Sequence, residues 1–231
     1  MRETTFTRAS HVQVIETLRK LDRSFLGQAH CYFGGGTRIV LELGEYRESR
    51  DVDFLCSSRD GYRVLRETVS EGSLGKIVAG KIALARDVRA DQYGIRTFIE
   101  TAHAKLKLEI VREARIDLEG EKVAKLPVAC LTRKHCFAEK FLANADRGRD
   151  ASTLSRDIVD LAFMTQGWSK TDADAGLLIA KGAYGESVLR ALQAVIEKMG
   201  DKTYRNRCIE GLAIATPKVL TAGLKTLGSL V

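Results

Sequence analysis

The 231 residues predict an α/β (α+β) fold, in which a lobe built on a mixed β-sheet is followed by a lobe of α-helices. Two observations support this prediction. Short apolar segments punctuated by glycines are typical of strands and dominate the first half of the chain. Beyond Pro127 these signals fade and helical periodicity replaces them. We therefore expect an α/β lobe at residues 1–125 and a helical lobe at residues 126–231 that completes an active cleft.

The predicted elements of the first lobe mix helices with strands. Apolar residues at helical spacing predict helices within 7–26, 39–43 and 62–69. Apolar or alternating segments predict strands at 30–33, 52–56, 81–86, 95–100 and 105–111. In the second lobe, helical periodicity predicts six helices, at 131–145, 155–165, 172–180, 187–199, 203–213 and 217–227.

Three consecutive glycines, from Gly34 to Gly36, follow the first predicted strand and precede a predicted helix. Such a turn lets main-chain N–H groups approach phosphate oxygens, because no Cβ stands in the way. The positive end of the helix also favours an anion, and Thr37 adds a hydroxyl donor. Taken alone, a glycine triplet is more often only a tight turn.

A pair of carboxylates, Asp51 and Asp53, stands at the start of the next predicted strand. Their spacing of two places both on one face, while Val52 and Phe54 face the core. Two like charges this close repel unless a cation lies between them, and hard oxygen ligands suit Mg²⁺ or Mn²⁺. An Asp-x-Asp pair alone is more often a solvated strand edge or a helix cap. Combined with the glycine turn, it indicates nucleotidyl transfer from a nucleoside triphosphate.

Two-metal transfer generally requires a further carboxylate near the attacking hydroxyl. The segment 104–111 alternates polar and apolar residues, which places Lys105, Lys107 and Glu109 on one strand face. Glu109 is therefore the candidate for the third metal-binding carboxylate. The alternative is a solvent-facing row of charges, which is ordinary in antiparallel sheets.

Three parts of the chain carry motifs that together match one known family. They are Gly35-Gly36-Thr37 with Arg47-x-Ser49-x-Asp51-Val52-Asp53-Phe54, the strand 107–113, and the helical pair 138–143 and 156–161. In these segments the chain resembles the AbiEii/AbiGii toxin-type nucleotidyltransferases, a branch of the DNA polymerase β-like superfamily. The chain departs from the pattern in Thr37, where Ser is usual, and in an extra preceding glycine. The segment 146–155 also lengthens the gap between Lys140 and Asp157.

The resemblance implies a polymerase β-like nucleotidyltransferase lobe and a set of site residues. Metal would be bound by Asp51 and Asp53, and Lys140 and Asp157 would be essential residues of the nucleotide pocket. The implied nucleotide-binding residues are Gly35, Gly36, Thr37, Arg47, Ser49 and Lys140.

Each catalytic candidate has an expected role. Glu109 would support the ion that activates the acceptor hydroxyl, Lys140 would neutralise charge on the phosphates, and Asp157 would orient Lys140 or the acceptor. An alternative for Asp157 and Asp160 is a favourable charge at a helix N-terminus.

Composition limits the class of protein. Hydrophobic residues make up 45% and charged residues 29%, as in ordinary globular proteins. No apolar run approaches the roughly 18 residues that cross a bilayer, and residues 1–5 lack the apolar centre of a secretion signal. We therefore expect a cytoplasmic location without membrane contact. Five scattered cysteines without a Cys-x-x-Cys argue against zinc or a disulfide framework.

The sequence leads to a principal hypothesis and two alternatives. The principal one is a metal-dependent nucleotidyltransferase, the toxin of a toxin–antitoxin or phage-defence pair, that attaches a nucleoside monophosphate to an RNA hydroxyl, with tRNA among the candidates. The net charge of +7 and the arginines around the Asp-x-Asp strand suit a polyanionic acceptor. A cognate antitoxin would be a further partner. The alternatives are transfer to a small molecule, as in antibiotic-modifying enzymes, and a nucleotide-binding module without turnover.

Overall fold

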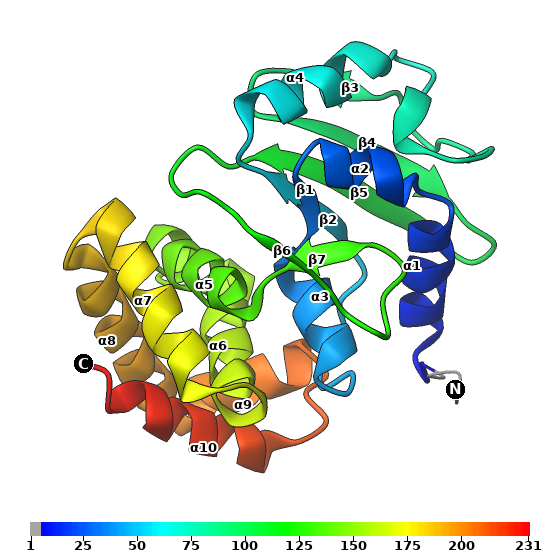
Figure 1. The fold of residues 1–231 in the computed structure, drawn as a ribbon. Helices are drawn as coiled ribbons and strands as arrows, with labels where there is room; N and C mark the ends of the chain where they lie inside the picture. Colours follow the sequence, from blue (N-terminus) through cyan, green and yellow to red (C-terminus); the bar gives the residue numbers. More distant parts are fainter. Residues whose placement is uncertain (1–5) are drawn as a thin grey trace. The chain divides into compact units, whose positions relative to one another are not determined.

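The computed structural model describes residues 6–231 and divides into two compact units (Figure 1). The first unit consists of the described residues up to Glu42 together with Ser49–Thr132. The second consists of Leu43–Glu48 and Arg133–Val231. A short segment between a helix and a strand of the first unit thus belongs to the second. The lobes proposed from the sequence, with their cleft, stay a prediction.

The first unit is built on a seven-stranded sheet in the order β3-β4-β5-β2-β1-β7-β6. Its strands are β1 (Cys31–Phe33), β2 (Val52–Cys56), β3 (Arg89–Ala90), β4 (Gly94–Glu100), β5 (Lys105–Arg112), β6 (Gly120–Lys122) and β7 (Ala129–Leu131). Strand β2 is parallel to β5 and β1 is parallel to β7, whereas the other pairs are antiparallel. The predicted mixed sheet is therefore confirmed.

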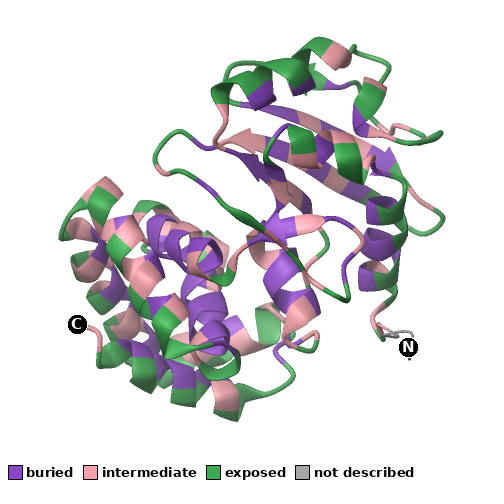
Figure 2. Ribbon diagram, in the orientation of Figure 1, coloured by how far each residue is buried: buried purple, intermediate pink, exposed green. Residues whose placement is uncertain are grey.

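Alternation along the central strands sets the two faces of this sheet. In β2, Val52 and Phe54 are buried, and Leu108 and Ile110 are buried beside them in β5. The Phe33 ring packs against Phe54 with centroids 5.6 Å apart. Figure 2 shows buried residues along the strands and the helices that contact them. This apolar face is the core of the unit and leaves the polar residues of β2 and β5 on the opposite face.

The helices of the first unit are α1 (Ala9–Arg19), α2 (Arg23–Gln28), α3 (Gly35–Glu42) and α4 (Arg59–Thr68), with a short 3₁₀ turn η1 (Gly75–Ile77). The single helix predicted within 7–26 is in fact two. The break occurs because the Asp22 carboxylate accepts hydrogen bonds from the N–H groups of Ser24 and Phe25, both at 2.9 Å, and so caps a new helix.

One strand prediction was wrong. The segment 81–86 forms no strand and makes a single bridge, Leu84 to Ile99, flanked by two main-chain hydrogen bonds. The segment lies along the edge of β4 beyond its two pairs with β3, but it pairs there only around Leu84 and so forms a bridge and not a strand. Strands β3, β6 and β7 were not predicted, because each has only two or three residues and none is marked by a signal such as the glycine triplet that follows β1.

The second unit is helical, and its six predicted helices are confirmed. They are α5 (Arg133–Arg147), α6 (Arg156–Gly167), α7 (Lys170–Tyr184), α8 (Ser187–Gly200), α9 (Lys202–Gly211) and α10 (Pro217–Gly228), with a 3₁₀ turn η2 (Ala151–Thr153). Their starts follow familiar signals, with Ser169 and Asp201 as N-caps and Pro217 in the first turn. The rings of Trp168 and Phe137 pack edge to face in the core, with centroids 5.9 Å apart. No helix within residues 6–231 could span a membrane.

Candidate active site

The glycine turn of the first unit joins β1 to α3 beside Asp53. The N–H of Gly34 donates to the carbonyl of Asp53 at 2.8 Å. Gly35 has a φ of +67°, and a Cβ at this position would stand 2.5 Å from Asp53 Oδ2. Glycine is thus required twice, for its backbone angle and for the space that the carboxylate takes. Helix α3 begins at Gly35, so its positive end lies beside this carboxylate.

Asp53 and Glu109 lie side by side. The two residues are direct partners in the parallel register of β2 and β5, so their side chains project from the same face at neighbouring positions. Both are half-buried, as is Asp51, which comes just before β2. The folded chain therefore brings together carboxylates that are far apart in sequence.

The Glu109 carboxylate already has cationic partners. It accepts a hydrogen bond from Arg96 Nε at 2.7 Å and another from Lys107. Burial opposes its ionisation, but the hydrogen bonds and charges of Lys107 and Arg96 outweigh burial and lower the pKa of Glu109. Glu109 is thus an ionised carboxylate neutralised by protein. Within the described chain, no three His, Cys, Asp or Glu side chains are grouped to hold a metal ion, so the metal-binding role of Asp51, Asp53 and Glu109 stays a prediction.

Two predicted nucleotide-binding hydroxyls are also brought together. Thr37 Oγ1 and Ser49 Oγ are 2.8 Å apart, and the N–H of Ser49 donates to His11 Nε2 at 3.4 Å. Thr37 is fully buried in the first part of α3, and Gly36 precedes it in that helix. Thr37 thus holds Ser49 near the glycine turn. Any contact of these residues with a nucleotide stays a prediction.

The second unit contains a buried cluster of charges around α6. Lys140 of α5 lies 2.8 Å from Asp157 Oδ1 and 2.7 Å from Asp160 Oδ2. Lys140 is 6% exposed, Asp157 2% and Asp160 0%. The longer segment 146–155 therefore does not separate Lys140 from Asp157. Asp157 lies in the first turn of α6, but its side chain is bound by Lys140 and by Arg147, which donates through Nε at 2.7 Å.

Arg47 belongs to the same cluster. Its Nε and Nη2 donate to the two oxygens of Asp160 at 2.7 and 2.8 Å, and its Nη1 donates to the carbonyl of Glu48. Tyr46 donates its hydroxyl to Asp160 at 2.6 Å, and its ring stacks on Phe163 with centroids 3.9 Å apart. The structure thus places Arg47 inside the second unit, where its guanidinium binds Asp160. Its predicted contact with a nucleotide stays a prediction.

Sequence reasoning missed Asp160 as the centre of this cluster. The spacing of three between Asp157 and Asp160 on one helix was a usable signal, because it places both on the same face. Burial alone would suppress ionisation of both carboxylates, but the cations around them lower their pKa values, and the two aspartates in turn raise the pKa of Lys140 against its burial. Arg47, Lys140 and the two aspartates therefore stay charged in the interior, whereas Arg147 binds Asp157 from a side chain that is 41% exposed.

A glycine turn beside Asp53, on a mixed sheet, is the arrangement expected of a nucleotidyltransferase, and the family match places the chain in that class. More specifically, the chain belongs to the family described as the nucleotidyl transferase AbiEii toxin of type IV toxin–antitoxin systems, whose model matches residues 17–218. A search of curated proteins found no match.

Solved structures that match this chain include the following three. A protein from H. pylori, described as a candidate nucleotidyltransferase, is 16% identical, with 98% of this chain and 99% of that chain covered and a TM-score of 0.46. An antigenic nucleotidyltransferase-like protein from Paracoccidioides brasiliensis is 13% identical, with coverage of 80% and 94% and a TM-score of 0.43. The antibiotic-resistance factor ANT(2'')-Ia is 15% identical, with coverage of 87% and 99% and a TM-score of 0.35.

Proposed function

We propose that this nucleotidyltransferase moves a nucleoside monophosphate from a nucleoside triphosphate to a hydroxyl of an RNA acceptor, tRNA being a candidate, and that it acts as a toxin held in check by a cognate antitoxin. One observation carries the proposal. The carboxylate of Asp53 occupies the space left by the missing Cβ of Gly35, beside its register partner Glu109. This adjacency supports a phosphate-binding turn placed next to metal-binding carboxylates.

The glycine turn would bind the terminal phosphates. Main-chain N–H groups at Gly35 and Gly36 lie at the start of α3, where the helix dipole favours negative charge. The side chain of Thr37 faces Ser49 and not open solvent, so its role is to fix Ser49 at the edge of the turn. Ser49 is the hydroxyl that we assign to the phosphates.

The donors present fit a divalent cation. Asp51 and Asp53 are half-buried carboxylates at successive same-face positions, and these are the hard oxygen ligands that Mg²⁺ or Mn²⁺ takes. When bound, the ion would neutralise phosphate charge and lower the pKa of the acceptor hydroxyl. Glu109 would join as a third ligand by exchanging one of its hydrogen bonds with Lys107 or Arg96.

The proposed transfer is a single displacement. The acceptor oxygen forms a bond to the α-phosphorus while the bond from that phosphorus to the bridging oxygen of the β-phosphate breaks, and the electron pair leaves with pyrophosphate. The hydroxyl proton passes to a carboxylate on the Asp53 face. Lys107 and Arg96 stand next to this face through their bonds to Glu109 and would oppose the build-up of negative charge.

Lys140 and Asp157 are proposed as essential residues through their effect on position and charge. Asp157 holds Lys140 at 2.8 Å, so it sets where the ammonium lies. The same cluster holds Arg47 through Asp160, and the segment that contains Arg47 runs directly into Ser49 and Asp51 along the chain. Loss of either residue would therefore lower transfer.

Incorporation of label into RNA tests the proposal. Purified protein with α-³²P-labelled nucleoside triphosphates, Mg²⁺ and total RNA should label RNA, and Asp53→Ala should reduce labelling by at least about 10²-fold. The matched control is Glu16→Ala, which removes an exposed carboxylate of α1 and should leave labelling unchanged. Labelling in the presence of EDTA should also disappear and return with Mg²⁺. Equal labelling by wild type and Asp53→Ala would reject the assignment.

A further inference from the structure

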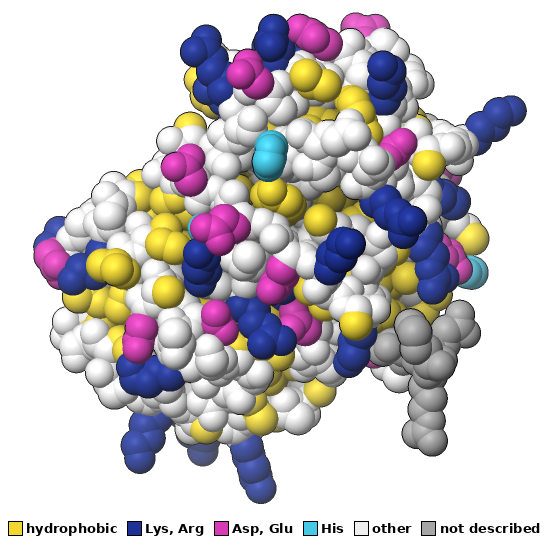
Figure 3. Space-filling view, in the orientation of Figure 1, with side chains coloured by type: hydrophobic (Ala, Val, Ile, Leu, Met, Phe, Trp, Pro, Cys, Tyr) yellow, Lys and Arg dark blue, Asp and Glu magenta, His cyan; other side chains and the backbone are white. Residues whose placement is uncertain are grey.

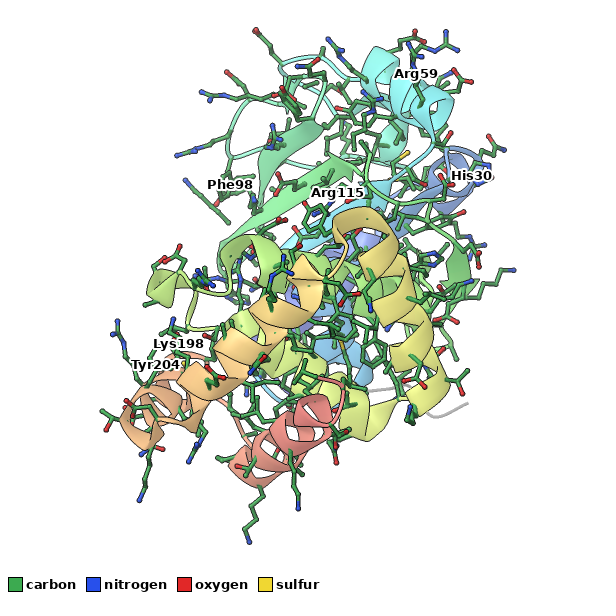
Figure 4. The ribbon with its side chains drawn as sticks, turned by 90° about the vertical axis from the view of Figure 1, so that its left-hand side faces the viewer. His30, Arg59, Phe98, Arg115, Lys198 and Tyr204 are labelled. Carbon is green, nitrogen blue, oxygen red and sulfur yellow. The ribbon has the colours of Figure 1, made fainter. Side chains whose placement is uncertain are left out.

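A cavity of about 440 Å³ in the first unit is lined mainly by arginines. It lies between α4 and the ends of β4 and β5, and its lining residues are Arg59, Tyr62, Arg63, Arg66, Glu67, Gln92 and Arg112. Four of these seven side chains are guanidinium groups and one is acidic. Figure 4 labels Arg59 at the start of α4. The cavity therefore concentrates positive charge outside the residues assigned to transfer.

These arginines are largely available to a ligand. In the described chain, Arg59, Arg66 and Arg112 form no ion pair, and Arg63 makes one at 3.4 Å with exposed Asp60. On the face shown in Figure 3, several basic side chains stand beside acidic ones. Guanidinium groups without carboxylate partners favour phosphate, which they bind through paired hydrogen bonds.

The spacing of the arginines suits a row of phosphates. Arg59, Arg63 and Arg66 occupy positions i, i+4 and i+7 of α4, so they form a stripe about 10 Å long on one helix face. One phosphate group cannot bridge that length, whereas about three successive phosphates of a strand can. Arg66 also lines a second cavity, of about 490 Å³, together with Arg89, which extends the stripe.

The floor of the cavity is rigid. Tyr62 is buried, and its hydroxyl donates to the carbonyl of Asp91 at 2.7 Å, which ties α4 to the turn before β4. The carboxylate of Asp91 in turn accepts the N–H groups of Tyr93 and Gly94. The main chain of Arg112 is fixed as well, by a hydrogen bond to the carbonyl of Tyr93 at 2.9 Å. The arginine side chains are therefore the part of the cavity that can adjust to a ligand.

This cavity is separate from the candidate active site. Arg112 follows Glu109 by three residues in β5, so it lies about 10 Å further along the strand and on the other sheet face. We propose that the arginine stripe of α4, with Arg112, binds the phosphate backbone of the RNA acceptor away from its reacting end. This inference rests on the proposed transfer to RNA and adds the surface that holds the body of the acceptor.

Binding and transfer can be measured separately. The test uses the full chain with a 5′-fluorescein-labelled 30-nucleotide RNA of mixed sequence, followed by fluorescence anisotropy. Arg59→Gln/Arg66→Gln should bind about tenfold more weakly, to a similar degree for unrelated RNA sequences. The slope of log affinity against log salt should also fall by about 1 for each phosphate that the variant no longer binds. The control is Arg19→Gln/Lys20→Gln, which removes the same charge from exposed residues of α1 and its C-cap and should bind as wild type.

The outcomes distinguish this inference from the proposed function. A KM for RNA that rises in Arg59→Gln/Arg66→Gln, with an unchanged KM for the nucleotide, supports the stripe. If wild type labels no RNA but loses affinity with the same two substitutions, transfer to RNA fails while the phosphate-binding stripe stands. Equal RNA affinity of this variant and the control overturns the stripe. Poly-glutamate serves as a second probe. If Arg59→Gln/Arg66→Gln loses affinity for poly-glutamate but keeps its affinity for RNA, the stripe is overturned as an RNA site in favour of an acidic protein partner.

Discussion

The two units hold their acidic side chains under opposite conditions. In the first, Asp53 and Glu109 stand half-buried on one sheet face, and the Glu109 side chain keeps 17% of its surface exposed. In the second, Asp160 has no exposed surface and accepts from Tyr46, Arg47 and Lys140. A carboxylate at a solvent boundary can exchange a protein donor for an ion or a substrate. A carboxylate that is enclosed by cations, such as Asp160, cannot make this exchange, and its role is to stabilise the fold.

The largest expected effect on stability comes from substitution of Asp160. Asp160→Asn leaves two buried cations with a neutral partner, and breaking a buried ion pair in this way costs about 3–5 kcal/mol of the free energy of unfolding. Asp53→Asn should change the free energy of unfolding by under about 1 kcal/mol while abolishing transfer. Urea denaturation of both variants checks this contrast, and equal destabilisation would remove the distinction between the two units.

Gly35→Ala comes next. A Cβ at a φ of +67° costs about 1–2 kcal/mol, and here it would also displace the Asp53 carboxylate, so both stability and transfer should fall. Gly27→Ala is the matched control, because nothing lies within 4 Å of its Cβ and it sits in α2, where alanine stabilises by about 0.5–1 kcal/mol. Thermal melts and RNA labelling of both variants make the comparison. Full activity of Gly35→Ala would show that the close approach of Gly35 and Asp53 is not needed.

Tyr46→Phe isolates one hydrogen bond of the buried cluster. The ring can keep its stacking on Phe163, and Asp160 keeps its cations, so the loss should be near about 1 kcal/mol. Tyr93→Phe, at a 65% exposed tyrosine, should change nothing measurable. Chemical denaturation measures the difference. If Tyr46→Phe leaves the free energy of unfolding unchanged, Asp160 does not need this donor.

The smallest effect is expected from mild acid. The pKa values of Asp157 and Asp160 are lower in the folded chain than the usual value of about 3.9 for an unfolded aspartate. Their contribution to the free energy of unfolding is therefore complete above about pH 4, and it is lost as the pH falls through their pKa values in the folded state. The urea midpoint should change little from these groups between about pH 7 and 5 and should drop below about pH 4. In Asp160→Asn, the urea midpoint should fall less steeply below about pH 4 than in the wild type. An equally steep fall in both proteins would exclude this cluster as the source of the acid sensitivity.

Sequence periodicity was sufficient where an element is long enough to show a period. Alternation correctly placed β2, β4 and β5, and it put Asp53 on the opposite face from Phe54. It failed at 81–86, where the segment meets the edge of β4 in a single bridge and not in a ladder. Helical spacing located all six helices beyond residue 131, because each buries one apolar face.

The contacts of the candidate residues were harder to predict, since they depend on partners far along the chain. Alternation gave the face of Glu109 but not its register opposite Asp53. The family resemblance predicts Arg47 as a nucleotide ligand and says nothing of its partner Asp160, which lies 113 residues further on. Only the folded chain reveals such pairs.

The segment Leu43–Glu48 has a consequence for how the protein can be divided. It is held by residues of the second unit, through Asp160, through Phe163, and through main-chain bonds from Glu48 to Leu212 and from Ala215 to Tyr46. A gene truncated after Thr132 would encode the whole sheet but leave this segment without its supports. A single crossover after Thr132 would therefore join the Leu43–Glu48 segment of one homologue to the rest of the second unit of another, and we expect such a chimera to lose stability.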